Sequence, residues 1–244
     1  MARLQSTQWQ TEHRVVIDEF IDFINKKTDG FILKGGTALM KCYGLDRFSE
    51  DIDFDKKSDE NLLNYIEDFC DEKGYTYRVA KDTETTTRAF INYGNSSRPL
   101  KIEVSARRKM IPDSETNVID GISVYNIDRL CVMKSFAYSG RDKIRDLYDL
   151  TFICNNHYDA LSETTLTGVR DVLEHKGIEQ FDYLLRQEKD ELINPDKLAD
   201  DFINLHEKLG LLYDNNEKSI VEEFKKPKEQ EVKIEVKPQR KPKL

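Results

Sequence analysis

The sequence has no long hydrophobic run. None of its apolar stretches approaches the ~20 residues that a membrane-spanning helix needs. Residues 1–14 also lack the apolar core of a signal peptide. We therefore expect a cytoplasmic protein with no membrane segment.

Cysteine and histidine are scarce, with four residues of each type. The cysteines, at positions 42, 70, 131 and 154, form no CxxC pair, and each has apolar neighbours. This pattern predicts buried, reduced thiols. Because the histidines are equally isolated along the chain, the sequence gives no support to a zinc site or to a Cys/His nucleophile pair.

The negative charge of the protein is unevenly distributed. Residues 225–244 hold eight Lys or Arg and three Glu, so they carry +5 of a total of −8, and residues 1–224 carry −13. An acidic body argues against broad, non-specific nucleic-acid binding but leaves room for a local basic groove. Three prolines and few apolar residues predict a disordered basic tail over 225–244. This tail is either a solvated end or a nucleic-acid-binding arm.

The spacing of apolar residues divides the chain into two structural parts. The first part mixes helices with strands, and turn residues at 92–96 predict a hairpin between its fourth and fifth strands. Its expected helices are 8–27, 37–43 and 58–73, the last capped by Ser58 or Asp59, and its expected strands are 31–33, 51–55, 75–80, 85–93, 100–106 and 122–125.

The second part is helical almost throughout. The expected helices are 128–139, 141–155, 162–175, 178–189, 195–209 and 215–224. We therefore predict an α/β domain over residues 1–126, a helical domain over 127–224 and the basic tail over 225–244.

A glycine pair marks the start of the second expected helix. Gly35 and Gly36 follow a short apolar strand and precede Thr37. Without a Cβ atom, glycine lets backbone N–H groups approach a phosphate closely, and a helix N-terminus adds partial positive charge. This segment therefore indicates a phosphate-binding site.

Two aspartates follow Gly35, Gly36 and Thr37 after thirteen intervening residues. Asp51 and Asp53 stand two residues apart on an expected strand, so both carboxylates point to the same face and can hold divalent metal at one place. A solvated strand end is the alternative. Glu50 and Asp55 add further negative charge to the segment, which would be repulsive without a metal. Together with the glycine pair, the aspartates indicate a site for a nucleoside triphosphate and its Mg²⁺.

Glu103 is the best candidate for a third carboxylate. It lies between Ile102 and Val104 on an expected strand, where an acid is costly to bury. A third acid would complete a two-metal cluster of the kind used in phosphoryl transfer. The alternative is an ordinary half-exposed strand on which Lys101 and Glu103 face water.

Four segments in order resemble the AbiEii/AbiGii-type nucleotidyltransferase toxins, which belong to the DNA polymerase β-like nucleotidyltransferase superfamily. The resemblance extends over roughly residues 28–155. Its segments are FILKGGTAL (31–39), RFSEDIDF (47–54), KIEV (101–104), and the helix with Lys134 followed by RDKIRDLYDL (141–150).

The resemblance implies an α+β fold, with the polymerase β-like mixed sheet flanked by helices and followed by an all-helical C-terminal region. It also implies a two-metal site. Asp51 and Asp53 would hold both Mg²⁺ ions, with Mn²⁺ as the other candidate ion, and Glu103 would bind one of them and help to deprotonate the attacking hydroxyl.

The resemblance also implies nucleotide contacts. Gly35, Gly36 and Thr37 would surround the triphosphate, and Lys134 would neutralise a β- or γ-phosphate oxygen. Arg145 and Asp146 would lie on a helix that faces the cleft. A helix salt bridge and a domain-packing contact are the alternative roles for these two residues.

The implied function is metal-dependent transfer of a nucleoside monophosphate from an NTP to an acceptor hydroxyl, possible acceptors including a tRNA 3′ end. The protein would be the toxin of a toxin–antitoxin or phage-defence (abortive infection) system, with a cognate antitoxin as partner. Two alternatives stay open. The acceptor is a small molecule or a protein, or the chain is a nucleotide-binding module that has lost turnover.

Overall fold

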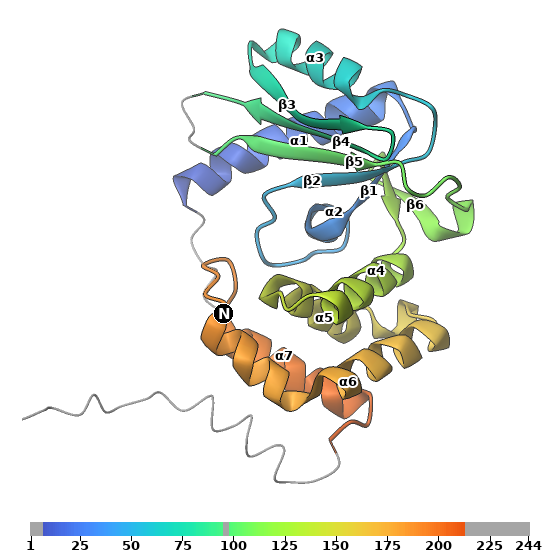
Figure 1. The fold of residues 1–244 in the computed structure, drawn as a ribbon, viewed down its shortest axis with the longest axis vertical. Helices are drawn as coiled ribbons and strands as arrows, with labels where there is room; N and C mark the ends of the chain where they lie inside the picture. Colours follow the sequence, from blue (N-terminus) through green and yellow to red (C-terminus); the bar gives the residue numbers. More distant parts are fainter. Residues whose placement is uncertain (1–6, 95–97, 213–244) are drawn as a thin grey trace, which may run out of the picture.

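The protein folds into a sheet-containing part and a helical part that lie one above the other (Figure 1). The computed structural model describes residues 7–94 and 98–212, so the expected helix at 215–224 and the basic tail lie outside the described residues. The helices of the sheet part are α1 (Gln8–Lys27), α2 (Gly35–Cys42) and α3 (Leu62–Lys73); those of the helical part are α4 (Ile127–Gly140), α5 (Ile144–Asn156), α6 (Glu163–Gln187) and α7 (Pro195–Lys208).

The sheet is mixed and has seven strands in the order β3-β4-β5-β2-β1-β7-β6. Strand β2 lies near its middle, antiparallel to β1 and parallel to β5. This arrangement confirms the predicted mixed sheet flanked by helices. The strands are β1 (Phe31–Lys34), β2 (Ile52–Lys56), β3 (Thr76–Thr83), β4 (Thr86–Asn92), β5 (Leu100–Ser105), β6 (Thr116–Ile119) and β7 (Ile122–Tyr125).

Strand β2 separates the hydrophobic core from the polar face of the sheet. Ile52 and Phe54 are fully buried, whereas Asp53 between them is half-buried. Because side chains alternate between the two faces of a strand, the apolar residues of β2 face the core and the acids face the opposite side. Core packing thereby fixes the register that presents the acids.

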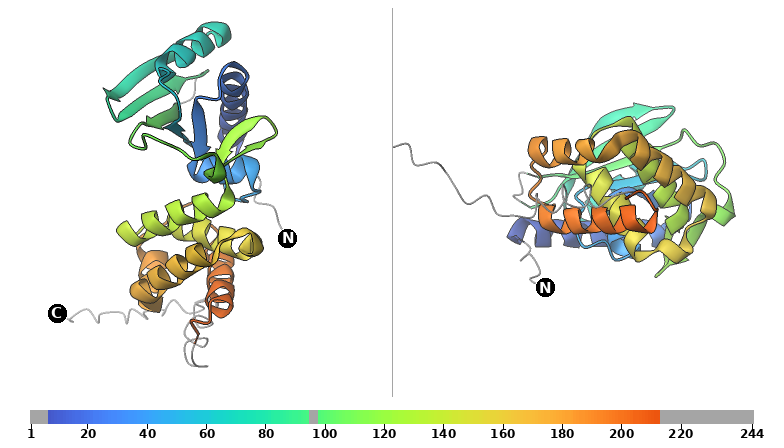
Figure 2. Two further views of the ribbon diagram at one scale, coloured as in Figure 1. Left: turned by 90° about the vertical axis from the view of Figure 1, so that its right-hand side faces the viewer. Right: turned by 90° about the horizontal axis from the view of Figure 1, so that it is seen from below.

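Helix α2 lies between the sheet and the helical part (Figures 1 and 2). It contacts β1 and β2 on one side and α4 on the other. Within the helical part, α4 packs against α5 and α6, and α5 packs against α7. The N-terminus of α2 is therefore placed where the two parts of the molecule meet.

Two expectations about individual elements need correction. Helix α3 begins at Leu62 instead of residue 58, because the side chain of Asn61 accepts the cap hydrogen bond from Leu63 N. Neither Ser58 nor Asp59 caps it, and Ser58 Oγ donates to Glu60 Oε1 instead. Strand β6 was not expected at all.

The expectation of two helices over 162–175 and 178–189 is confirmed within α6. Gly177 has φ of +70° and ψ of 169°, which lie outside the helical range, so α6 consists of two helices that meet at a kink. The break falls between the two expected helices.

All four cysteines are free thiols. Cys70, Cys131 and Cys154 are buried, which confirms the expectation, whereas Cys42 is only half-buried. Throughout residues 7–94 and 98–212, no helix has both the length and the apolar character that a membrane crossing requires.

Candidate active site between the sheet and the helical part

Strands β2 and β5 bring the three predicted carboxylates to one face of the sheet. Asp53 and Glu103 are direct neighbours in the parallel pairing of these strands. Asp51 immediately precedes β2 and is two residues from Asp53, so its side chain is directed to the same face. The structure therefore gathers the three acids that the sequence marked as separate motifs.

The backbone of Gly35 lies directly beside Asp53. Gly35 has φ of +75°, and a Cβ atom at this position would be 3.1 Å from Asp53 Oδ2. Glycine is favoured here for two reasons: it tolerates this backbone conformation, and it leaves room for the Asp53 carboxylate. The glycine motif and the aspartate motif thus meet in space.

Gly36 makes room for a different pair of side chains. A Cβ atom there would be 2.7 Å from Ser49 Oγ and 2.8 Å from Arg47 Nη2. The hydroxyl of Thr37 donates to the carbonyl oxygen of Asp51. These contacts fix the N-terminus of α2 against the segment that leads into β2.

Two cations neutralise two of the three acids. Lys101 Nζ is 2.5 Å from Asp51 Oδ2, and Arg88 Nε is 2.6 Å from Glu103 Oε2. Burial disfavours the charged form of Lys101, but the hydrogen bond and the negative charge of Asp51 raise its pKa. Lys101 and Arg88 therefore hold two carboxylates as ion pairs on the face of the sheet.

The ionisation of Asp53 is opposed by its surroundings. Burial, together with the negative charges of Asp51 and Glu103, raises the pKa of the Asp53 carboxyl, while Lys101 opposes the shift. Carboxylate oxygens are the ligands that Mg²⁺ prefers, so the donor set fits a divalent metal. Within the described ranges, however, no three His, Cys, Asp or Glu side chains already form a metal-ligand group.

Lys134 lies in a buried network of charges on the helical side. Its Nζ is 2.6 Å from Asp149 Oδ2 and 3.5 Å from Asp146 Oδ1. Arg47 Nε and Nη2 donate to the two Asp149 oxygens over 2.6 and 2.7 Å. Because Arg47 also adjoins Gly36, this network connects Lys134 to the glycine backbone.

Asp149 is ionised within this network. Burial opposes its ionisation, but the charges of Lys134 and Arg47 and their hydrogen bonds hold the pKa of Asp149 below its usual range. The Arg47–Asp149 pair also joins the loop before β2 to helix α5, 102 residues further along the chain. It therefore helps to fix the helical part against the sheet part.

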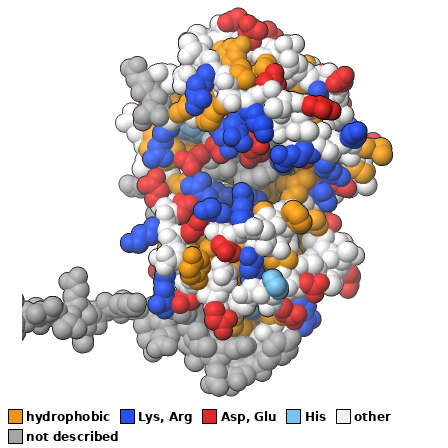
Figure 3. All heavy atoms as spheres, in the orientation of Figure 1, with side chains coloured by type: hydrophobic (Ala, Val, Ile, Leu, Met, Phe, Trp, Pro, Cys, Tyr) orange, Lys and Arg blue, Asp and Glu red, His pale blue; other side chains and the backbone are white. Residues whose placement is uncertain are grey.

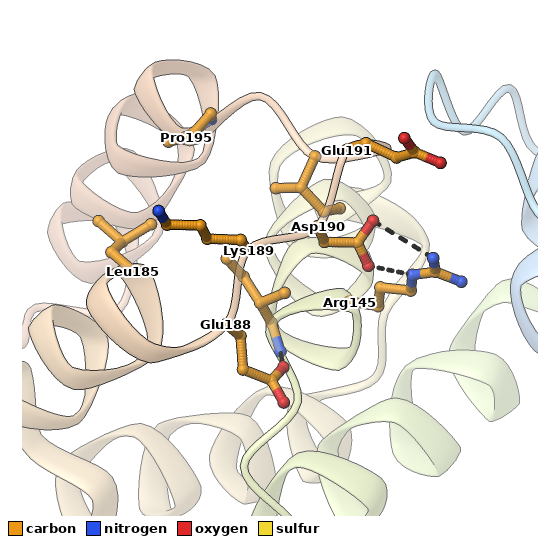
Figure 4. Close-up of a pocket in the computed structure, with 9 residues that line it drawn as sticks. Arg145, Leu185, Glu188, Lys189, Asp190, Glu191 and Pro195 are labelled. Carbon is orange, nitrogen blue, oxygen red and sulfur yellow. Dashed lines mark hydrogen bonds and ion pairs between the residues drawn. The ribbon is translucent and has the colours of Figure 1, made fainter.

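Arg145 and Asp146 both make ion pairs in the structure. Asp146 is buried and receives hydrogen bonds from Arg141 over 2.6 and 3.2 Å. Arg145 Nη1 is 3.0 Å from Glu50 Oε2, and Arg145 also binds both carboxylate oxygens of Asp190 (Figure 4). Arg145 thus connects the segment beside Asp51 to the loop between α6 and α7.

The surface around the site is basic. Lys and Arg side chains gather on both sides of the hollow between the two parts of the molecule (Figure 3). Arg141 lies on the helical side of the site, and its side chain is 63% exposed. The hydrogen bond from Arg141 to Asp146 is the main cause that raises the pKa of Arg141, and the negative charge of Asp53 raises it further. The acids of the candidate site are therefore accompanied by cations from both parts of the molecule.

Several residues of the site were not identified from the sequence. Arg88 was missed because its partner Glu103 is fixed by the register of β4 and β5, which the sequence does not reveal. Arg47 and Asp149 stand inside the motifs that carry the family resemblance, but their pairing over 102 residues has no local signal. The sequence shows Lys101 only as a neighbour of Glu103 on the same strand, and its contact with Asp51 depends on the pairing of β2 with β5.

Two solved structures from Helicobacter pylori share this fold. JHP933 is 26% identical to this chain with a TM-score of 0.70, and the match covers 90% of this chain and 99% of JHP933. A second protein, provisionally assigned as a nucleotidyltransferase, is also 26% identical with a TM-score of 0.70, covering 86% of this chain and all of the other. The fold is therefore shared with structures that include one assigned as a nucleotidyltransferase.

The sequence also matches a family model. The model describes the nucleotidyl transferase AbiEii toxin of type IV toxin–antitoxin systems and matches residues 23–231. The chain belongs to this family and is a nucleotidyltransferase. Membership implies a role in a toxin–antitoxin system and an antitoxin as partner. Among curated proteins, none matches the sequence.

Proposed function

We propose that the protein transfers a nucleoside monophosphate from an NTP to an acceptor hydroxyl in a metal-dependent reaction. The observation that carries this proposal is the placement of Asp53 between the backbone of Gly35 and the side chain of Glu103. A phosphate-binding backbone and a set of metal-binding carboxylates adjoin each other there. That juxtaposition suits a nucleotide and its metal better than either ligand alone.

The residues divide into two groups by role. Gly35, Gly36 and Thr37 would bind the triphosphate at the N-terminus of α2, where the backbone N–H groups and the helix dipole favour an anion. Lys134 would neutralise a β- or γ-phosphate oxygen from the helical side. Arg145 would border the nucleotide, oriented by its ion pairs.

The carboxylates form the second group. Asp51, Asp53 and Glu103 would hold one or two Mg²⁺ or Mn²⁺ ions, which supply charge neutralisation for the α-phosphate and the leaving group. The pairing of Asp146 with Arg141 keeps that guanidinium near the same cleft. Asp146 would therefore act by orienting Arg141.

The reaction is an in-line displacement at the α-phosphorus. A bond forms between the acceptor oxygen and the α-phosphorus, and the bond to the bridging oxygen of the β-phosphate breaks, so pyrophosphate leaves with the electron pair. The hydroxyl proton passes to a carboxylate oxygen of Glu103. Alignment of the reacting atoms and charge stabilisation by the site account for the lower barrier.

We further propose an RNA acceptor, with a tRNA 3′ end as the first candidate. Support comes from the basic surface around the cleft and from the family's toxin role, since a modified tRNA end stops translation (Figure 3). Both substrates are cytoplasmic molecules, so the proposal places the protein in the cytoplasm. The net charge of −13 on residues 1–224 favours the second candidate acceptor, a hydroxyl on a protein or small molecule.

Labelling with each α-³²P-NTP, with and without total tRNA, tests the proposal. We expect label on tRNA in the presence of Mg²⁺, and loss of that label on addition of EDTA. Label only on protein would overturn the RNA acceptor, and no label with any NTP would overturn the transfer itself.

Asp53→Ala provides the matched test of the site. We expect it to abolish labelling and growth inhibition while the protein stays folded, as measured by circular dichroism. Asp59→Ala is the control, because the side chain of Asp59 is fully exposed and pairs only with Lys56 among the described salt bridges. Equal toxicity of Asp53→Ala and the native chain would favour a binding module without turnover.

A further inference from the structure

The three carboxylates and two cations form two neighbouring rows on one face of the sheet. Asp53, Glu103 and Arg88 are register neighbours across β2, β5 and β4. In the adjacent row, Lys101 stands two residues before Glu103 and contacts Asp51. Each row thus has an acid toward β2 and a cation on β4 or β5.

Each cation contacts one oxygen of a carboxylate that is a candidate metal ligand. Lys101 Nζ is 2.5 Å from Asp51 Oδ2, and Arg88 Nε is 2.6 Å from Glu103 Oε2. A divalent ion bound to the same carboxylates would be repelled by both cations at short distance. Both side chains are long and partly exposed, 26% for Lys101 and 41% for Arg88, so each has space to move away.

The order of the strands indicates where the released cations would lie. Gly35 adjoins Asp53 on the β1 side, whereas Arg88 adjoins Glu103 on the β4 side. The proposed triphosphate and the two cations therefore lie on opposite sides of the carboxylates. The β4 side is the one left for the acceptor, and a nucleic-acid acceptor brings phosphodiester groups there.

We propose that Lys101 and Arg88 are resident counter-ions of the metal-free site, which metal binding displaces from Asp51 and Glu103 and frees to bind phosphodiester groups of the acceptor. This inference rests on the proposed function for the identity of the acceptor. Without metal, Lys101 and Arg88 neutralise two of the three acids, and with metal the two cations become available to a nucleic-acid acceptor.

Metal binding without nucleotide tests the displacement. Mn²⁺ titrations by calorimetry or electron paramagnetic resonance would compare the full chain with Lys101→Met and Arg88→Gln. We expect each variant to bind Mn²⁺ on the order of fivefold more tightly, the effect of removing one charge from a partly solvated site. Unchanged or weaker binding in both variants would overturn the displacement, because cations that merely support the carboxylates would give that result.

Lys56→Met is the matched control for the metal titration. Lys56 is on β2 but three residues from Asp53, hence on the other face, and its ammonium pairs with the exposed Asp59 over 3.2 Å. Its Mn²⁺ affinity should equal that of the native chain. Circular dichroism confirms the fold of each variant, and two separate variants keep the test valid if one of them unfolds.

The proposed binding of acceptor phosphodiester groups by Lys101 and Arg88 is tested with a fluorescent single-stranded RNA oligonucleotide, whose binding is measured by anisotropy. The native chain should bind the RNA several-fold more tightly with Mn²⁺ than without, and this gain should be lost in Lys101→Met and Arg88→Gln. A gain that persists in both variants would overturn the acceptor role. Neither measurement requires turnover. If the variants bind Mn²⁺ more tightly but no NTP labels any acceptor, the result would overturn the proposed function and leave the displacement intact.

Discussion

The backbone of Gly35 lies against the carboxylate of Asp53, so closely that a Cβ atom at Gly35 would be 3.1 Å from Asp53 Oδ2. Gly35 belongs to α2 and Asp53 to β2. The contact makes the geometry of the phosphate-binding backbone dependent on the position of a candidate metal ligand. A substitution at Gly35 must therefore change the position of the Asp53 carboxylate.

Replacement of Gly35 by alanine should impair transfer more than stability. The left-handed φ of +75° costs a non-glycine residue about 1–2 kcal/mol, and the new methyl group would also displace Asp53. We expect a loss of at least about tenfold in transfer rate, since small displacements of reacting groups are costly. Initial rates with labelled NTP, together with urea unfolding, measure the two effects.

Gly44→Ala separates strain from contact. Gly44 has nearly the same φ, +77°, but a Cβ atom there meets nothing within 4 Å. It should lose a similar amount of stability and keep its transfer rate. Equal rates for the two variants would show that the contact with Asp53 has no functional weight.

Lys134→Met should weaken NTP binding without unfolding the protein. Asp149 keeps Arg47 as partner and Asp146 keeps Arg141, so no buried carboxylate is left alone. A charge-assisted contact with a phosphate is worth about 1.5–3 kcal/mol, which predicts a rise in KM for NTP of roughly tenfold or more. Steady-state kinetics over a range of NTP concentrations checks this.

Lys176→Met is the control for Lys134→Met. The side chains of Lys176 and Lys134 are 15% and 13% exposed, and Lys176 likewise forms an ion pair, with Asp142 at 2.8 Å. Its KM should match that of the native chain. A KM that stays unchanged in both variants would remove Lys134 from the nucleotide site.

Arg145→Met distinguishes a nucleotide contact from a contact between the two parts of the molecule. Arg145 pairs with Glu50 and Asp190 in the structure. As a nucleotide contact, Arg145→Met should raise the KM for NTP more than Asp190→Asn does, because the latter removes only a partner. Equal effects of the two variants on KM and on the urea midpoint would assign Arg145 to the packing contact.

How much the sequence could reveal depended on whether the signal was local. The glycine pair and the aspartates were recognisable because each motif has its spacing in a short segment. Strand β6 also has a local signal, because Asp120 and Gly121 between apolar residues favour a tight hairpin turn. Their φ values are +50° and +80°, and they join β6 to β7.

Other features had no local signal. The pairing of Arg88 with Glu103 depends on strand register, and that of Arg47 with Asp149 joins positions 102 residues apart. Helix α3 is capped by Asn61, which accepts a hydrogen bond from Leu63 N, because Ser58 Oγ instead donates its hydrogen bond to Glu60. Such choices are made by tertiary packing, so the sequence alone predicts the acids of the site but not the cations that hold them.

Asp149→Asn should make the protein less stable at neutral pH, by an amount that diminishes on acidification. Removing one partner of a buried ion pair costs about 3–5 kcal/mol. Because the pKa of Asp149 is held below its usual range in the folded protein, its ionised form stabilises the fold above the unfolded-state pKa of about 3.9. That contribution is lost as the pH falls through the lower, folded-state pKa.

Urea unfolding of the native chain and of Asp149→Asn, at pH values from neutral down to about 3, measures this difference. The gap in unfolding free energy should stay constant above about pH 5 and shrink below about pH 4. Asp113→Asn is the control, because the side chain of Asp113 is 92% exposed and its pair with Lys57 spans 3.2 Å. A gap that does not change with pH, or one no larger than that of Asp113→Asn, would mean that the Arg47–Asp149–Lys134 network does not hold the two parts of the molecule together.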